Sequence, residues 1–224
     1  KAMNVKLISY SKPAIQMEEE LKNAQDLIAY CARVSNPSNQ LNTETSSKLL
    51  HYLVQHKHWS PFEMVSACLE IETTRDIGRQ ILRHRSFSFQ EFSQRYANPL
   101  DDLKFTRREA RLQDPSNRQN SIEIDDEDPL QNTIRQQWLA HQDKIALDAH
   151  KAYTWAIENG IAKEQARAIL PEGLTLSRMY VNGTLRSWIH YIELRSDHGT
   201  QKEHIEIARA VSYTHLRAHE TQPY

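Results

Sequence analysis

The stretch that decides the fold is PFEMVSACLEIETTRDIGRQILRHRSFSFQEFSQRY, residues 61–96. Apolar and polar residues alternate through its first part, and the pleat of a strand places every second side chain on the same face. The alternation predicts a strand over residues 61–74 with one apolar face, formed by Val65, Ala67, Leu69 and Ile71. Thr74 is a favourable N-cap residue, so we expect a helix to follow directly over residues 75–85.

The chain on either side of this stretch has mostly helical periodicity. Further strand patterns occur only at residues 3–11 and 174–181. Apolar residues at helical spacing predict helices over residues 17–35, 45–58, 129–160, 163–170, 184–195 and 199–211. Many helices and few strands indicate the α+β class, with a helix-rich single domain packed on a small, mostly antiparallel sheet.

Composition narrows the classes of function. Lys and Arg total 28 against 29 Asp and Glu, a formal net charge of -1, so the chain has no global positive field to hold a polyanion. The two cysteines, Cys31 and Cys68, have no paired spacing, and we expect both to be core residues of a protein from a reducing compartment. No stretch resembles a signal peptide or a membrane span, which predicts a cytoplasmic protein without a membrane partner.

Two segments are set apart by their composition. Residues 106–128 are rich in Arg, Asp, Gln, Asn and Ser, and we expect a polar surface excursion without a fold of its own. Residues 212–221, SYTHLRAHET, resemble the translation of a sequencing adapter, and we leave them out of the fold prediction. The predicted catalytic domain is therefore residues 1–211.

Arginines follow one another along the predicted helix. Arg75, Arg79 and Arg83 are spaced at i, i+4 and i+8, where like charges cost a helix roughly 0.2–0.5 kcal/mol per pair. Compensation should come from nearby carboxylates. For Arg75 and Arg79 we expect these to be Glu63, Glu70 and Glu72.

Arg83 and Arg85 have a different context, because irregularly spaced hydroxyls and charges follow them up to Arg95. A guanidinium fork binds phosphate oxygens through two parallel hydrogen bonds, so this cluster predicts a site for phosphate-bearing ligands. His84 lies between the two arginines, and like charge should lower its pKa and keep it neutral. Ser93 has no evident base partner, so we expect it to bind phosphate rather than act as a nucleophile.

These motifs resemble the signature of the flavin-dependent thymidylate synthase family. RHRSFSFQEFSQRY, residues 83–96, carries the strongest likeness, and HKHWSPFE, residues 56–63, resembles a second family segment. ARAILP and ELRSD, residues 166–171 and 193–197, resemble two further blocks. The likeness extends over roughly residues 4–211, and it implies a thymidylate synthase-complementing-protein type fold.

The resemblance implies reductive methylation of dUMP to dTMP without an enzyme nucleophile. The carbon donor would be 5,10-methylenetetrahydrofolate, and FAD reduced by NADPH would supply the hydride, with the choice between NADPH and NADH left open. Arg195 would be the catalytic residue that stabilises negative charge on the pyrimidine. The implied dUMP-binding residues are Gln80, Arg83, Glu91, Ser93, Gln94, Arg95, Arg167 and Arg195.

The implied FAD-binding residues come from three segments: His58, Ser60, Arg83, His84, Arg85, Glu91, Arg186 and His190. Gln90 and His190 stand where many members have Asn. The family also implies a homotetramer with sites shared between subunits, and aromatic residues that we expect to be exposed would suit such an interface: Phe87, Phe89, Phe92 and Tyr96. The alternative is that two of these aromatics fill the core.

Two other functions remain open at this point. Arginines interleaved with aromatics occur in single-stranded nucleic-acid-binding proteins, although the net charge argues against one here. A His-based metal hydrolase could use His56, His58, Glu63 and His84, but the sequence has no HExxH partner motif. We therefore expect no nucleic-acid partner and no metal.

Overall fold

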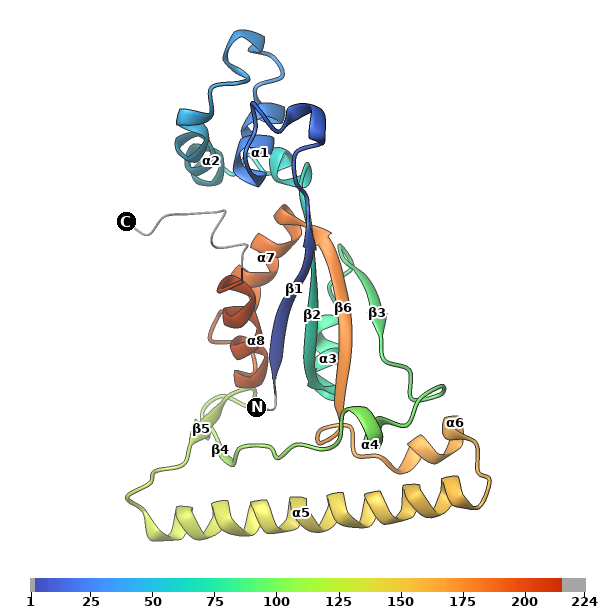
Figure 1. The fold of residues 1–224 in the computed structure, drawn as a ribbon. Coiled ribbons are helices and arrows are strands. Elements are labelled where there is room, and N and C mark those ends of the chain that lie inside the picture. Colours follow the sequence, from blue (N-terminus) through green and yellow to red (C-terminus); the bar gives the residue numbers. More distant parts are fainter. Residues whose placement is uncertain (1–2, 215–224) are drawn as a thin grey trace.

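The computed structural model describes residues 3–214, and its centre is a four-stranded antiparallel sheet in the order β1-β2-β6-β3 (Figure 1). Helices lie along one side of this sheet, at its upper end and across its base. This arrangement confirms the predicted α+β class. The strands are β1 (Asn4–Tyr10), β2 (Ser66–Thr74), β3 (Ser88–Glu91) and β6 (Leu176–Thr184).

One face of the sheet is buried under helices. In β2, Ala67, Leu69 and Ile71 are buried, as the alternation predicts. They share one core with side chains of α3 (Arg75–Ile81), α7 (Leu185–Arg195) and α8 (Lys202–Ser212), of which Ile77, Ile81, Trp188 and Ile207 are at most 1% exposed. Burying each such side chain stabilises the fold by roughly 1.5–3 kcal/mol.

The opposite face of the sheet carries charged cross-strand pairs. Glu72 lies opposite Arg178, whose Nε donates to Glu72 Oε1 at 2.7 Å. Glu70 lies opposite Tyr180, whose hydroxyl donates to Glu70 Oε2 at 2.9 Å. These pairs form only in the observed β2–β6 register, since a slip of one residue would turn every side chain of the strand to the other face.

The two cysteines are not core residues. Cys68 lies on β2 between buried residues, and it is half-buried like Cys31, so the core position predicted for both is wrong.

The acids predicted to compensate Arg75 and Arg79 are engaged elsewhere. Glu63 faces Arg186, with Oε2 at 3.6 Å from Nη1. Arg75 and Arg79 instead share Glu172, with Nε–carboxylate distances of 3.2 and 2.7 Å. Glu172 follows Pro171 just before β6, so the pairing depends on tertiary contact and was wrongly predicted from sequence proximity.

The start of the first helix, the end of α3 and the capping role of Thr74 differ from the prediction. Helix α1 (Ala24–Ala32) begins after Asn23, whose side chain accepts the Asp26 N–H at 3.0 Å, so the acids of residues 18–20 lie outside it. Helix α3 ends at Ile81, so Arg83 is not stacked with Arg75 and Arg79. Thr74 occupies the N-cap position, but its hydroxyl donates to Asp76 Oδ1 rather than capping a backbone N–H.

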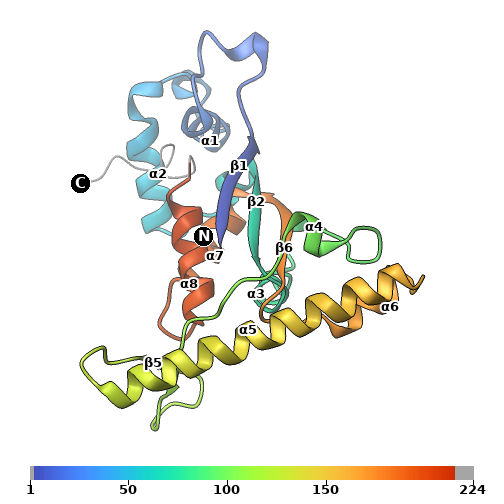
Figure 2. The ribbon, with the colours of Figure 1, turned by 60° about the horizontal axis from the view of Figure 1, so that its bottom comes forward.

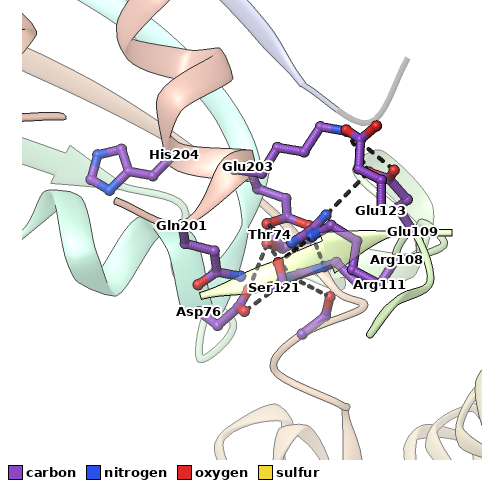
Figure 3. A network of polar contacts seen from close by, with 12 residues as sticks. Thr74, Asp76, Arg108, Glu109, Arg111, Ser121, Glu123, Gln201, Glu203 and His204 are labelled. Atoms are coloured by element: carbon purple, nitrogen blue, oxygen red, sulfur yellow. Dashed lines mark hydrogen bonds and ion pairs between the residues drawn. The ribbon is translucent and has the colours of Figure 1, made fainter. Parts of the chain in front are cut away.

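The polar segment 106–128 contains a short hairpin that its composition did not predict. It contains the hairpin of β4 (Arg111–Gln113) and β5 (Ser121–Glu123), and Ala110 and Ile124 beside it are buried. Ion pairs hold this hairpin to α3 and α8 (Figure 3). We call these side chains the hairpin network: Thr74, Asp76, Arg108, Glu109, Arg111, Ser121, Glu123, Lys202 and Glu203.

Helix α5 (Pro129–Glu158) has 30 residues and runs across the base of the molecule (Figures 1 and 2). Asp128 caps it by accepting the N–H groups of Leu130 and Gln131, and Gly160, with φ +81°, follows its end. Tyr153 and Ala156 of α5 are buried in a second, smaller core, and Ile157 of the same helix packs against it. The remaining helices are α2 (Ser46–Gln55), α4 (Pro99–Asp102) and α6 (Lys163–Ala166).

The aromatic residues near the RHR motif are mostly covered. Phe87 is 7% exposed and belongs to the core, so its predicted exposure is wrong, and Phe89 is partly buried and packs against that core. Phe92 is half-buried, and Tyr96 is 81% exposed.

Across residues 3–214, every helix is too short or too polar to span a bilayer. Of the segment resembling an adapter, residues 215–221 lie outside the described residues.

Candidate functional site

Most of the predicted site residues lie in three clusters, and His58, Arg83 and Arg85 lie outside them. The first, which we call the Arg195 cluster, forms where the end of α3, the end of α7 and the start of α8 meet. Arg195 Nε donates to His84 Nε2 at 2.9 Å, and Arg195 Nη2 donates to the Gln80 carbonyl at 3.4 Å. Two residues more than 110 positions away in the sequence are thus brought onto the guanidinium predicted to be catalytic. The members of the cluster are Gln80, His84, Tyr191, Arg195 and His204.

Electrostatics in this cluster keep the imidazole of His84 neutral. Burial, followed by the charge of Arg195, lowers the pKa of His84 to about 4. The predicted neutrality is confirmed, but the cause is different, because the flanking arginines were expected to produce it. Burial also lowers the pKa of Arg195, with Arg83 adding to the effect.

Arg195 has no carboxylate partner among residues 3–214. Its hydrogen bonds go to a neutral imidazole and a backbone carbonyl, and neither carries a negative charge. A guanidinium has five N–H donors in a planar fork, so further donors remain available. The cluster therefore holds a partly buried positive charge that a ligand can neutralise.

The second cluster, the Ser60 cluster, forms where the 3₁₀ turn η4 (Ser60–Glu63) packs against α7. Arg186 on α7 pairs with Glu63 at 3.6 Å, and its Nε lies 3.5 Å from His190 Nε2. The His190 ring meets the Trp59 ring edge-on, with centroids 4.7 Å apart. The structure thus brings Ser60, Arg186 and His190 to one place, as the resemblance implies.

His58 lies next to this turn in the sequence but faces other rings. Its imidazole is 6.2 Å from the Tyr52 ring and 6.1 Å from the His56 ring, centroid to centroid. No group of three or more His, Cys, Asp or Glu side chains within residues 3–214 is placed to hold a metal ion.

The third cluster, the Glu91 cluster, lies at the end of β3. This strand was not predicted, because the mixed composition of residues 83–96 conceals a four-residue strand that pairs with β6. Ser177 Oγ donates to Glu91 Oε1 at 2.9 Å, and Arg75 Nη1 lies 3.6 Å from the same oxygen. The predicted carboxylate is therefore held by a hydroxyl and a cation.

Arg95 and Arg167 of the Glu91 cluster meet at Glu164. Arg95 Nη2 donates to the Glu164 carboxylate at 3.3 Å, and Arg167 Nε donates to the Glu164 carbonyl at 3.3 Å. Ser93 Oγ accepts the Arg95 backbone N–H at 3.3 Å, and Gln94 is buried. The exposed Arg95–Glu164 pair is worth about 0–1 kcal/mol, so an anionic ligand could replace it at little cost.

Arg83 and Arg85 are exposed, and neither side chain makes a hydrogen bond or ion pair with another described residue. The three clusters are likewise not joined to one another by any side-chain hydrogen bond or ion pair within residues 3–214. Surface hollows of about 330 and 140 Å³ lie beside the hairpin network, and one of about 340 Å³ lies near the start of α1. None of these three hollows is lined by a predicted site residue.

Three further polar residues of the Arg195 region were missed by sequence reasoning: Tyr191, Gln201 and His204. Tyr191 and His204 are at most 1% exposed and lie at helical positions that read as core. Nothing in the sequence pattern distinguishes a buried polar pair from apolar core residues, since only the fold places Gln80 beside them.

Comparison with known proteins identifies relatives along almost the whole chain. The model of the family "Thymidylate synthase complementing protein" matches residues 16–218. A protein of Paramecium bursaria Chlorella virus 1 named "Probable flavin-dependent thymidylate synthase" is 50% identical over 93% of this chain and 91% of its own length. The "Flavin-dependent thymidylate synthase" of a Synechocystis species is 49% identical over 93% of this chain and 92% of its own length.

A solved structure shares the fold. The UMP/dUMP methylase PolB from Streptomyces cacaoi, bound with 5-Br dUMP, superposes with a TM-score of 0.74 at 24% sequence identity. The match covers 97% of this chain and 93% of that one. At this identity, the likeness supports the fold.

Proposed function

The chain belongs to the thymidylate synthase complementing protein family, and from this membership we propose that it is a methyltransferase of the flavin-dependent thymidylate synthase type. The proposed reaction methylates dUMP to dTMP. The carbon would come from 5,10-methylenetetrahydrofolate, and the reducing equivalents from NADPH through bound FAD. The proposed catalytic unit is residues 1–211.

The observation that carries the proposal is the uncompensated charge of Arg195. Its guanidinium is partly buried and held by two neutral acceptors, His84 Nε2 and the Gln80 carbonyl. A fixed cation aimed at developing negative charge lowers a barrier without moving a proton. Arg195 would stabilise the pyrimidine as its ring becomes electron-rich, which is the catalytic role we propose for it.

The residues of the Ser60 cluster fit a flavin dinucleotide. Arg186 offers guanidinium donors beside the Trp59–His190 ring pair, and the unpaired Arg83 and Arg85 offer charge for a pyrophosphate. His84 accepts from Arg195 at Nε2, so its neutral ring keeps the proton on Nδ1 and can donate it to a ligand oxygen. When bound, the flavin would supply the hydride, and these residues would hold and orient the flavin. The proposed contacts of Ser60, His58 and Glu91 complete this set.

The remaining proposed dUMP contacts combine the Arg195 and Glu91 clusters. Arg95 and Ser93 would bind the monophosphate, and Arg167 lies close enough to share Glu164 with Arg95. Neither cysteine is placed for nucleophilic attack in this proposal. Burial raises the pKa of Cys68, which keeps it a thiol.

We propose that the site is completed in a homotetramer. Helix α5 supports this, because five exposed apolar residues fall within an arc of about 100° at about 100° per residue. They are Leu130, Ile134, Trp138, Ile145 and Trp155, each at least 41% exposed. An apolar stripe of this kind suits packing against a second copy of the chain.

The proposed location is the cytoplasm, where reducing conditions keep Cys31 and Cys68 as free thiols.

The test begins with absorbance of the freshly purified protein. We expect the visible flavin band, bleaching on anaerobic addition of NADPH, and dTMP formation once dUMP and methylenetetrahydrofolate are supplied. A colourless protein that binds single-stranded DNA, or one with stoichiometric zinc, would contradict the proposal.

A further inference from the structure

Two polar side chains in the core have no role in the function proposed so far. His204 is 0% exposed and Tyr191 is 1% exposed, and both sit among apolar core residues. Burying polar groups costs free energy unless they are hydrogen-bonded. Their partners therefore show what the arrangement is for.

The two residues form a directed chain of hydrogen bonds that ends on Gln80. His204 Nδ1 lies 3.0 Å from Gln80 Oε1, which can only accept, so the imidazole proton is on Nδ1. His204 Nε2 is then an acceptor, and the Tyr191 hydroxyl donates to it at 2.8 Å. Burial, followed by the charges of Arg195 and His84, lowers the pKa of His204 to about 3, so the ring stays neutral.

Gln80 is held at both ends of its carboxamide. While Oε1 accepts from His204, Nε2 donates to Gln201 Oε1 at 3.0 Å. Each carboxamide atom keeps one unused position, a lone pair on the oxygen and an N–H on the nitrogen. The Gln80 backbone carbonyl also accepts from Arg195. The free positions thus belong to a rigid amide beside the proposed catalytic guanidinium.

The helix turn that carries Gln201 and His204 is itself anchored. Glu203, between them in the sequence, accepts from Arg111 Nη2 at 2.8 Å. Figure 3 shows Glu203 directed toward Arg108 and Arg111, while His204 points away from them. The hairpin network therefore holds one side of this turn, and the other side holds Gln80.

We propose that His204 is a positioning residue for the pyrimidine nucleotide, acting through the carboxamide of Gln80, with Tyr191 holding the imidazole in the required tautomer. This inference rests on the proposed function, because Gln80 must contact the substrate. An unheld glutamine samples several rotamers and both amide orientations. A glutamine fixed in advance loses less conformational freedom when the nucleotide binds.

The experiment compares His204→Leu with His204→Asn in the flavin-loaded protein. Leu removes both hydrogen bonds, whereas the side-chain amide of Asn lies near the Nδ1 position and can still donate to Gln80. We expect His204→Leu to raise the Kd and KM for dUMP about tenfold, as expected for a lost hydrogen bond that leaves a buried acceptor unpaired. His204→Asn should recover most of this loss, and Tyr191→Phe should lie between.

Flavin content and flavin reduction by NADPH without dUMP should stay at the wild-type level in all three variants. The matched control is Ile207→Ala, a cavity in the same helix at a residue that is 0% exposed. It should lower the urea midpoint but leave the Kd for dUMP unchanged. This control separates positioning from a general loss of stability.

Three outcomes would overturn the inference alone: wild-type dUMP affinity in His204→Leu, equal loss in His204→Asn, or an equal rise in Kd in Ile207→Ala. A wild-type protein that carries no flavin or fails to bind dUMP would instead overturn the proposed function, and this inference with it.

Discussion

The hairpin network and the Arg195 cluster both contain cationic side chains, yet these cations have different neighbours. Arg108, Arg111 and Lys202 each lie within 3.1 Å of a carboxylate oxygen. Among the residues that the structure describes, Arg195 has only neutral acceptors, and Arg83 and Arg85 have no side-chain partner. Charge neutralised within the chain serves the fold, whereas charge left uncompensated near a partly buried site remains available to an anionic ligand.

Glu203, a carboxylate of the hairpin network, shows the same pairing of opposite charges within the chain. Burial acts to raise the pKa of Glu203, but its own backbone N–H and Arg111 hold that pKa below the usual range. One of its oxygens, Oε1, has no hydrogen bond to any residue between 3 and 214 and lies 4.0 Å from Arg108 Nε. Each of the three cations of the network is therefore paired with a carboxylate, although not every carboxylate lone pair is satisfied.

Removing the uncompensated charge should have the largest effect. We expect Arg195→Ala to keep its bound flavin but lower kcat for dTMP formation by about 1000-fold or more, because transition-state charge loses its fixed partner. Single-turnover oxidation of the reduced flavin in the presence of both substrates measures this step. Turnover near the wild-type value would remove Arg195 from the catalytic role.

Arg83 tests whether an unpaired surface arginine binds ligand. Arg83→Ala should weaken FAD and dUMP together, by roughly 2 to 4 kcal/mol, as a charge-assisted contact is lost. Titration of the apoprotein with each ligand gives the two dissociation constants. Arg79→Ala is the matched control, since Arg79 pairs with Glu172 on the surface and its loss should cost about 0–1 kcal/mol of stability and no affinity.

Breaking the hairpin network should cost stability rather than chemistry. Arg111 and Glu203 have side chains only 10% and 19% exposed, so Arg111→Ala leaves a nearly buried carboxylate without its main partner. We expect the free energy of unfolding to fall by about 3 kcal/mol in urea titrations. The double variant Arg111→Met with Glu203→Leu should recover much of it, and a loss no larger in the single variant than in the double would contradict the assignment.

The two neutral histidines predict a pH effect of known sign. Their folded pKa values, about 4 for His84 and about 3 for His204, lie below the usual 6.5, so the unfolded chain takes up protons first as the pH falls. Stability should therefore decrease from pH 7 to pH 5, with His204 contributing at most about 2 kcal/mol. Urea titrations at both values should show a smaller decrease in His204→Asn, and an unchanged decrease would refute the contribution.

Local patterns predicted the parts of the molecule whose cause is local. The buried face of β2 follows from the alternation of apolar and polar residues. Helix α5 was predicted because Pro129 lies at its first position and Gly160 follows its end, so both signals are local. The α1 start was misplaced because acids at residues 18–20 suit a first helical turn as well as a loop. Strand β3 was missed because its four residues are stabilised by β6, more than 80 positions away.

Within the candidate site, residue types were predictable but partners were not. Motif resemblance named Gln80, His84 and Arg195, and the structure joins them. The buried pair of Tyr191 and His204 carried no sequence signal, because helical spacing marks a residue as inward-facing whatever its chemistry. The partner of Arg75 could not be predicted either, because the carboxylate that it binds, Glu172, lies 97 residues away in the sequence.

By itself, the sequence determined the types of most elements and the apolar face of the central strand. It also determined the resemblance to a family through an arginine-containing motif. Periodicity and motif chemistry both act over a few neighbouring residues, which is why they can be recognised in the sequence. Only the tertiary structure decided which arginines are neutralised and which stay free. Ion pairing depends on distances of a few ångströms between groups far apart in the chain, and no local pattern encodes those distances.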